Sequence, residues 1–140
     1  MTNPPPPRSA ARPQIRNIGI ADLAHYRLPV PGIVSILHRL SGLLMVLLLP
    51  LLLWLFELSL SSDRSFDQLV AFCRGTLARL VLLTLGWALL HHAAAGVRFL
   101  LLDLHIGAEK SAALRSASIV LAVSLPLAVL FALFLFGVLG

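Results

Sequence analysis

The sequence contains little charge for its length. Only 12% of its 140 residues are Asp, Glu, Lys or Arg, whereas 59% are hydrophobic. A soluble domain of this size cannot bury so much apolar surface. The composition therefore excludes a soluble globular fold and indicates an integral membrane protein.

Cysteine and acidic residues are also scarce. Cys73 is the single cysteine, which excludes an internal disulfide and any metal cluster ligated by cysteines of this chain alone. Six acidic residues stand against eleven Lys and Arg, giving a net charge of +5. The basic residues flank hydrophobic runs and do not alternate with aromatic residues, so they indicate no nucleic-acid partner.

The apolar residues form three runs, each long enough to cross a lipid bilayer as a helix, which takes about 20 residues. We therefore expect an all-α membrane protein in which residues 32–140 form three transmembrane helices, as part of a heteromeric helix bundle. The expected spans are about 33–60, 69–103 and 117–139, with a first polar loop at 59–66. Pro50 is expected to bend the first span.

Residues 1–31 are expected to form a tail followed by an interfacial segment. The tail contains the run Pro4–Pro7 and lacks the apolar block of a signal peptide. Basic residues gather in this region and in the second expected loop, at 103–115. The positive-inside rule therefore predicts a cytoplasmic amino terminus.

The second run carries polar residues that are rare in membrane spans, in the stretch HHAAAGVRFLLLD at 91–103. An intramembrane Arg costs roughly 2.5–3.5 kcal/mol on insertion scales, so such residues indicate a function. At about 100° per residue, His92 and Gly96 share one face, whereas His91 and Arg98 point about 100° and 120° away. The glycine leaves a hollow beside the imidazole. This arrangement suits a haem ligated by His92, with Arg98 nearer the helix end to meet a propionate; packing against a neighbouring helix is the alternative.

The first run opens with a second polar group. In SILHRLSG, residues 35–42, Ser35, Arg39 and Gly42 lie on one helix face with His38 beside them. A hydroxyl and a cation at one site can hydrogen-bond a quinone carbonyl and stabilise charge on the ring. Alternatively, Arg39 reaches lipid phosphate and Ser35 caps the helix.

Together, SILHRLSG at 35–42, HAAAGVRFLLLD at 92–103 and the Arg12–Pro13 pair resemble the cytochrome b membrane-anchor subunit of bacterial succinate dehydrogenase (complex II). The resemblance extends from roughly residue 12 to the end. It implies that His92 is an axial ligand of haem b and that a second membrane-anchor subunit supplies the other ligand.

The same resemblance implies that Ser35 and Arg39 belong to the ubiquinone site, and that His38 and Arg98 lie near the haem propionates. It further implies a multi-pass protein of the bacterial cytoplasmic (inner) membrane. Electrons would pass to quinone from an iron–sulfur subunit, while a flavoprotein subunit performs the succinate chemistry. Phe99 departs from the family pattern, since many bacterial members have histidine there, and His91 has no family role.

Three other functions are compatible with these residues. One is a structural, quinone-binding anchor without haem. Another is a small transporter or proton channel with His91, His92 and Arg98 as a relay. The third is a self-contained cytochrome ligated by both His38 and His92, although their expected depths differ by about half the hydrophobic thickness.

Overall fold

The computed structural model describes residues 28–137, which form four α-helices and no strand. The helices are α2 (Val30–Ser61), α3 (Asp63–Cys73), α4 (Thr76–Asp103) and α5 (Lys110–Leu135). The expected tail at 1–27 and the end of the third expected span, 138–139, lie outside the described residues.

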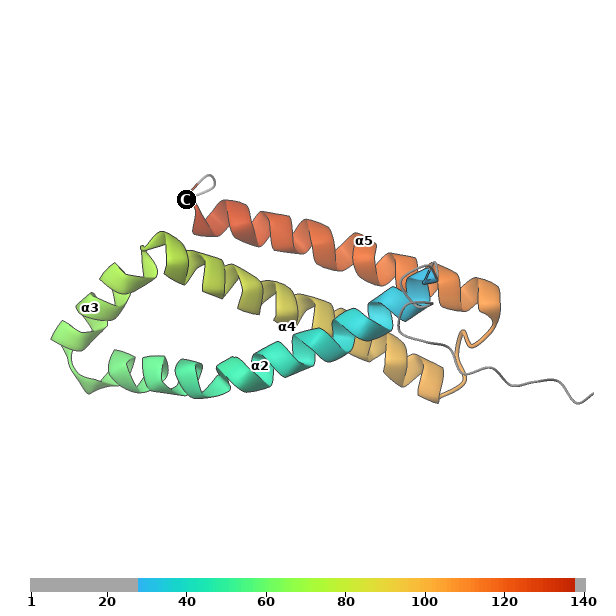
Figure 1. Cartoon of the computed structure of the whole chain (residues 1–140), viewed down its shortest axis with the longest axis horizontal. Coiled ribbons are helices and arrows are strands. Elements are labelled where there is room, and N and C mark those ends of the chain that lie inside the picture. Colours follow the sequence, from blue (N-terminus) through green and yellow to red (C-terminus); the bar gives the residue numbers. More distant parts are fainter. Residues whose placement is uncertain (1–27, 138–140) are drawn as a thin grey trace, which may run out of the picture.

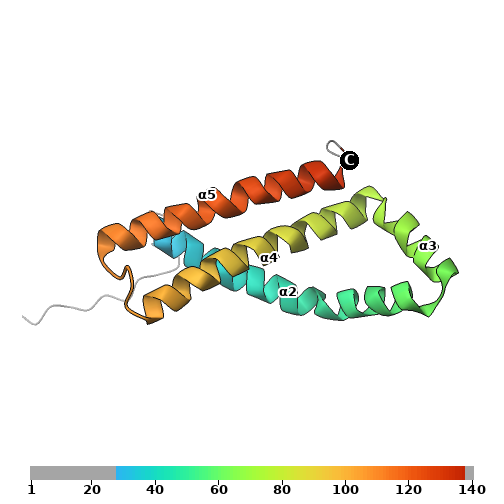
Figure 2. The same cartoon turned by 180° about the vertical axis from the view of Figure 1, so that it is seen from behind.

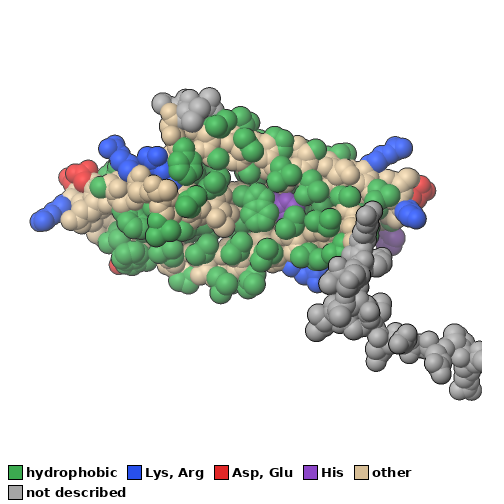
Figure 3. All heavy atoms as spheres, turned by 45° about the horizontal axis from the view of Figure 1, so that its top comes forward, with side chains coloured by type: hydrophobic (Ala, Val, Ile, Leu, Met, Phe, Trp, Pro, Cys, Tyr) green, Lys and Arg blue, Asp and Glu red, His purple; other side chains and the backbone are tan. Residues whose placement is uncertain are grey.

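Three of these helices, α2, α4 and α5, are long and apolar enough to cross a membrane. Hydrophobic side chains cover the middle of the face in Figure 3, and most charged side chains gather toward its two ends. A hydrophobic band between polar ends is the surface that a bilayer requires. The prediction of an all-α membrane fold is confirmed.

The central helix of the arrangement is α4. It packs against both α2 and α5, with α5 running alongside it and α2 crossing it at an angle (Figures 1 and 2). Near the start of α2 all three helices meet, and a small buried cluster forms there from Val34, Ala95, Ala117 and Val120. Three of the four side chains come from α4 or α5, and two are alanines, which allow close backbone approach between membrane helices.

Helix α2 changes direction along its length (Figure 1). Pro50 lies within this helix. A proline removes one backbone hydrogen bond and its ring clashes with the preceding turn, which bends a helix. The bend that the sequence predicted therefore has its expected cause.

The connection between α2 and α4 is helical rather than a polar loop. Ser62 ends α2 and caps α3 through a capping box, in which the Ser65 backbone N–H donates to the Ser62 hydroxyl at 3.1 Å. The Ser62 backbone N–H in turn donates to the Ser65 hydroxyl at 3.0 Å. The loop predicted at 59–66 is therefore wrong, because a serine pair starts a new helix inside it.

The boundaries of the other two spans also differ from the prediction. Helix α4 begins at Thr76, later than the predicted residue 69, because α3 ends at Cys73 and Gly75 separates the two helices. Helix α5 begins at Lys110, earlier than residue 117. Hydropathy marks where a helix enters hydrocarbon, whereas the helix itself continues into the polar interface.

Candidate functional site

The crossing of α2 and α4 is built from two reciprocal histidine–glycine pairs. Each helix carries His-x-x-x-Gly, as His38–Gly42 on α2 and His92–Gly96 on α4. A Cβ on Gly42 would lie 2.9 Å from His92 Cε1, and a Cβ on Gly96 would lie 3.7 Å from His38 Nε2. Gly42 therefore leaves space that the ring of His92 fills, whereas a Cβ at Gly96 would make only an ordinary van der Waals contact with His38.

The two imidazoles are stacked. The ring centroids of His38 and His92 lie 4.0 Å apart, with an angle of 13° between the ring planes. Phe99 packs against His38, and the centroids of the two rings lie 5.0 Å apart. The hollow expected beside Gly96 is thus occupied by the ring of His38.

His92 is oriented through one of its two ring nitrogens. Nδ1 lies 3.1 Å from the His38 carbonyl oxygen and 3.3 Å from the Ser41 hydroxyl. The carbonyl can only accept, so Nδ1 carries the proton and Nε2 holds a lone pair. No hydrogen bond to Nε2 is present within residues 28–137. An imidazole held by a carbonyl at one nitrogen and free at the other is the usual form of a histidine metal ligand.

These residues fit a haem that takes one axial ligand from this chain. Two imidazoles of this chain could hold one haem only with the group between them, whereas the rings of His38 and His92 stack directly on each other at 4.0 Å. Of these two histidines, His92 is the one whose ring is held by a backbone carbonyl. The described residues contain no cluster of three or more His, Cys, Asp or Glu that would bind a metal ion instead.

The predicted quinone residues lie together on α2. Arg39 Nη2 donates to the Ser35 hydroxyl at 3.2 Å, and Arg39 Nε donates to the Ser35 carbonyl oxygen at 3.4 Å. Arg39 is exposed and Ser35 half-buried. The guanidinium is therefore held at the surface of the bundle with several N–H groups still available.

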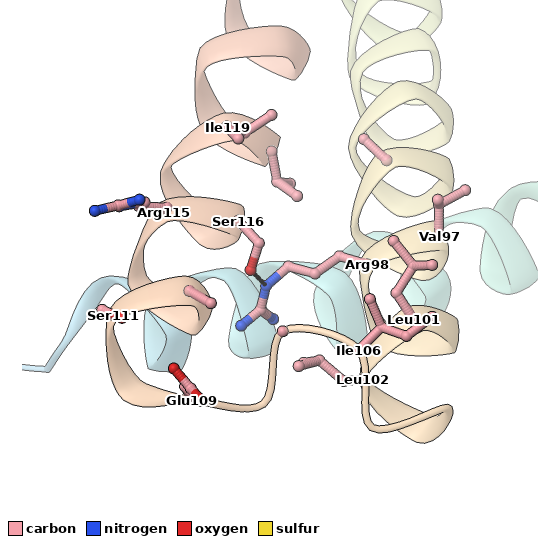
Figure 4. Close-up of a pocket in the computed structure, with 14 residues that line it drawn as sticks. Val97, Arg98, Leu101, Leu102, Ile106, Glu109, Ser111, Arg115, Ser116 and Ile119 are labelled. Atoms are coloured by element: carbon pink, nitrogen blue, oxygen red, sulfur yellow. Dashed lines mark hydrogen bonds between the residues drawn. The ribbon is translucent and has the colours of Figure 1, made fainter.

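Arg98 approaches the two stacked histidines only through Phe99, whose ring centroid lies 5.2 Å from its guanidinium carbon. Only 6% of its surface is exposed, and its guanidinium is directed at α5. Nε donates to the Ser116 hydroxyl at 3.0 Å (Figure 4). Nη2 donates to the Ala113 carbonyl oxygen at 3.3 Å. The structure thus does not bring Arg98 to the imidazole of His92, and its role near the propionates stays a prediction.

His91 has a contact that the sequence did not reveal. Its side chain is completely buried, and Nδ1 lies 3.2 Å from the Ser124 hydroxyl of α5. The ring also stacks on Trp87, with centroids 5.7 Å apart. His91 therefore joins α4 to α5, while its neighbour His92 joins α4 to α2. A polar residue near the middle of the third span was the signal for this contact.

These side-chain contacts bear on two of the alternative functions, the transporter or proton channel and the self-contained cytochrome. His91, His92 and Arg98 bond different partners, so no direct hydrogen bond joins them within residues 28–137. The predicted difference in depth between His38 and His92 is wrong, because their rings are in contact. Depths estimated along two helices separately ignore the angle at which the helices cross.

Fold and site together define a small helical membrane subunit with a polar histidine cluster at a helix crossing. Residues 16–134 match the family model described as the succinate dehydrogenase/fumarate reductase transmembrane subunit. The chain belongs to this family, as its two motifs predicted.

Two curated relatives are similar to this chain over much of its length. It is 34% identical over 105 residues to the succinate dehydrogenase cytochrome b556 subunit of Paracoccus denitrificans, covering 75% of this chain and 81% of the relative. It is 35% identical over 85 residues to the protein of the same name from Coxiella burnetii, covering 59% of this chain and 67% of the relative.

Proposed function

We propose that this chain holds haem b together with a second membrane-anchor subunit, and that it forms part of the ubiquinone site of a succinate:quinone oxidoreductase. The observation that supports haem binding is the hydrogen bonding of His92, whose Nδ1 is bonded to a carbonyl while Nε2 is free. The names of the relatives, cytochrome b556 subunits, support the same cofactor.

When bound, a b-type haem supplies reversible one-electron transfer. Other residues of this chain orient His92, the side chain that would hold the haem. The His38 carbonyl and Ser41 hydroxyl fix the tautomer of His92, and Gly42 leaves the ring its space. The second ligand of the haem iron would come from another chain, because among residues 28–137 the other imidazole at the crossing, His38, is stacked against His92. His38 is proposed to lie at the propionate edge.

Ser35 and Arg39 are proposed to bind the quinone. Arg39 keeps N–H donors free after bonding Ser35, and it can hydrogen-bond a quinone carbonyl and stabilise the charge that develops on reduction. Two protons must also reach the ring. Asp103 and His105 are candidates for this route, because both are exposed at the turn that follows α4.

The location that we propose is the bacterial cytoplasmic membrane, with the amino terminus and the α4–α5 turn in the cytoplasm. Three spans then place the carboxyl terminus on the opposite side. Lys110 and Arg115 lie in α5 close to this turn, and their positive charges support this orientation.

Purification in mild detergent tests the proposal. A tagged chain is expected to bring down a flavoprotein and an iron–sulfur protein, with b-type bands in a reduced-minus-oxidised optical spectrum. Copurification without those bands would support the haem-less anchor. A chain that purifies without partners would contradict the whole proposal.

The quinone assignment has its own test in the same complex. Arg39→Ala is expected to raise the KM for ubiquinone at least tenfold, since it removes a charged hydrogen-bond donor. Reduction of a soluble dye by succinate, which needs only the soluble subunits, serves as the internal control. An unchanged ubiquinone KM would exclude Arg39 from the site.

A further inference from the structure

A pocket of about 610 Å³ lies between the end of α4 and the start of α5, on a part of the molecule that the proposed function does not use (Figure 4). Its walls are largely apolar, with Val97 and Leu101 from α4 and Ile119 from α5. All three side chains are exposed on the outer surface of the bundle. The pocket therefore combines an apolar groove with an opening toward the surroundings.

The polar part of the pocket is cationic. Arg98 and Arg115 line it, with Glu109 as the acidic residue among the lining side chains. Arg98 is 94% buried, and its hydrogen bonds to Ser116 and Ala113 use two of its five N–H donors. No ion pair joins Arg98 to a carboxylate within residues 28–137. A buried cation without a counter-charge is costly, so a bound anion would stabilise this site.

The apolar wall of the pocket is distinct from the α2–α4 crossing, although the guanidinium of Arg98 also lies over the Phe99 ring, 5.2 Å from its centroid. At about 100° per residue, Ala94, Val97 and Leu101 lie roughly 140–200° from His92 around α4. The pocket thus opens on the side of the helix opposite the histidine cluster. It also lies where α4 ends and α5 begins, at one end of two helices that are long and apolar enough to cross a membrane.

We propose that this pocket binds an anionic phospholipid. The phosphate hydrogen-bonds the free donors of Arg98, with Arg115 at the rim, and one acyl chain follows the groove between Val97 and Ile119. Basic pockets between membrane helices bind anionic headgroups in this way. The charge selects against zwitterionic lipids, and the apolar groove selects a lipid over a free anion.

Native mass spectrometry of the delipidated complex tests the proposal, with phosphatidylglycerol and phosphatidylcholine added back in separate titrations. Arg115→Gln is expected to weaken phosphatidylglycerol binding about fivefold, the effect of one basic residue near a headgroup. Arg64→Gln is the matched control, because Arg64 is an exposed arginine on α3 at the other end of the bundle. Equal binding by the two variants would overturn the proposal.

Three further measurements distinguish a bound lipid from a free anion and from another protein chain in the pocket. Ile119→Trp fills the groove without changing charge and is expected to lower phosphatidylglycerol binding as well. Inorganic phosphate is expected not to displace the lipid; displacement at equal concentration would make this a free-anion site and overturn the proposal.

The third measurement asks whether another chain covers the groove. Ile119→Cys, in a Cys73→Ser background, is expected to react with a lipid-soluble maleimide in the intact complex. Protection from the maleimide together with cross-linking to the second anchor subunit would show that protein fills the pocket, and would overturn the proposal. The b-type spectrum, recorded on each sample, reports separately on the haem.

Discussion

A Cβ atom on Gly42 would lie 2.9 Å from Cε1 of His92, so no side chain at position 42 fits between α2 and α4. The carbonyl that orients His92 belongs to His38, one turn before Gly42 on the same helix. The position of the candidate haem ligand therefore depends on a glycine of the other helix.

Gly42→Ala is expected to displace His92 and to lower the haem content of the complex by at least half. The added methyl meets an imidazole held by two contacts, and such overpacking costs about 1–3 kcal/mol. The measurement is the haem-to-protein ratio from the optical spectrum. Gly32→Ala is the control on the same helix, since its nearest neighbours would lie 3.7 Å away.

Gly96→Ala distinguishes the two halves of the crossing. Its Cβ would lie 3.7 Å from His38, an ordinary van der Waals contact, so the variant is expected to keep its haem. Loss of haem in Gly96→Ala but not in Gly42→Ala would contradict the proposed packing.

Contacts within one helix of this site are predictable from the sequence, whereas contacts between two helices are not. Ser35 and Arg39 lie one turn apart on a single helix, so their contact is predictable from spacing alone. The stacking of His38 on His92 is not, because it depends on where two helices cross. The repeated His-x-x-x-Gly spacing is the one signal that would have suggested it.

The fold is predictable to a similar degree. Three apolar runs suffice for the three spans, because the bilayer fixes the length of a crossing helix. The helix α3 was missed because its start depends on the local pair Ser62 and Ser65, within a stretch whose composition is that of a loop.

Gly86→Ala is expected to lower the thermal stability of the complex, because the added methyl would collide with the ring of Phe131 on α5. The temperature of half-inactivation reports the loss. Phe131→Leu in the same chain makes room and is expected to restore most of it. An additive effect of the two substitutions would show that the residues do not touch.

Ser62→Ala is expected to loosen α3, because it removes the hydroxyl that caps the helix. Loss of an N-cap typically costs about 1 kcal/mol, and hydrogen exchange over 63–73 should become about fivefold faster. Ser61→Ala is the neighbouring control, since the Ser61 hydroxyl bonds only the Glu57 carbonyl of its own helix. Equal exchange in both variants would argue against the cap.

Ser124→Ala leaves Nδ1 of the buried His91 without its partner on α5. An unsatisfied buried polar group costs about 1–3 kcal/mol, so the inactivation temperature is expected to fall while the haem spectrum is retained. A matched change at exposed Ser118, whose hydroxyl bonds the Leu114 carbonyl of its own helix, should leave stability unchanged. Loss of haem in Ser124→Ala would give His91 a role that its contacts do not suggest.

The most direct test compares the two adjacent histidines. His92→Ala and His91→Ala are each introduced into the full complex, and the reduced-minus-oxidised optical spectrum is recorded. Loss or a shift of the b-type bands is expected in His92→Ala, and largely unchanged bands in His91→Ala, because His92 lies at the α2–α4 crossing with Nδ1 held by a carbonyl, whereas His91 is completely buried against Ser124 of α5. Retained bands in His92→Ala and lost bands in His91→Ala would contradict the ligand assignment.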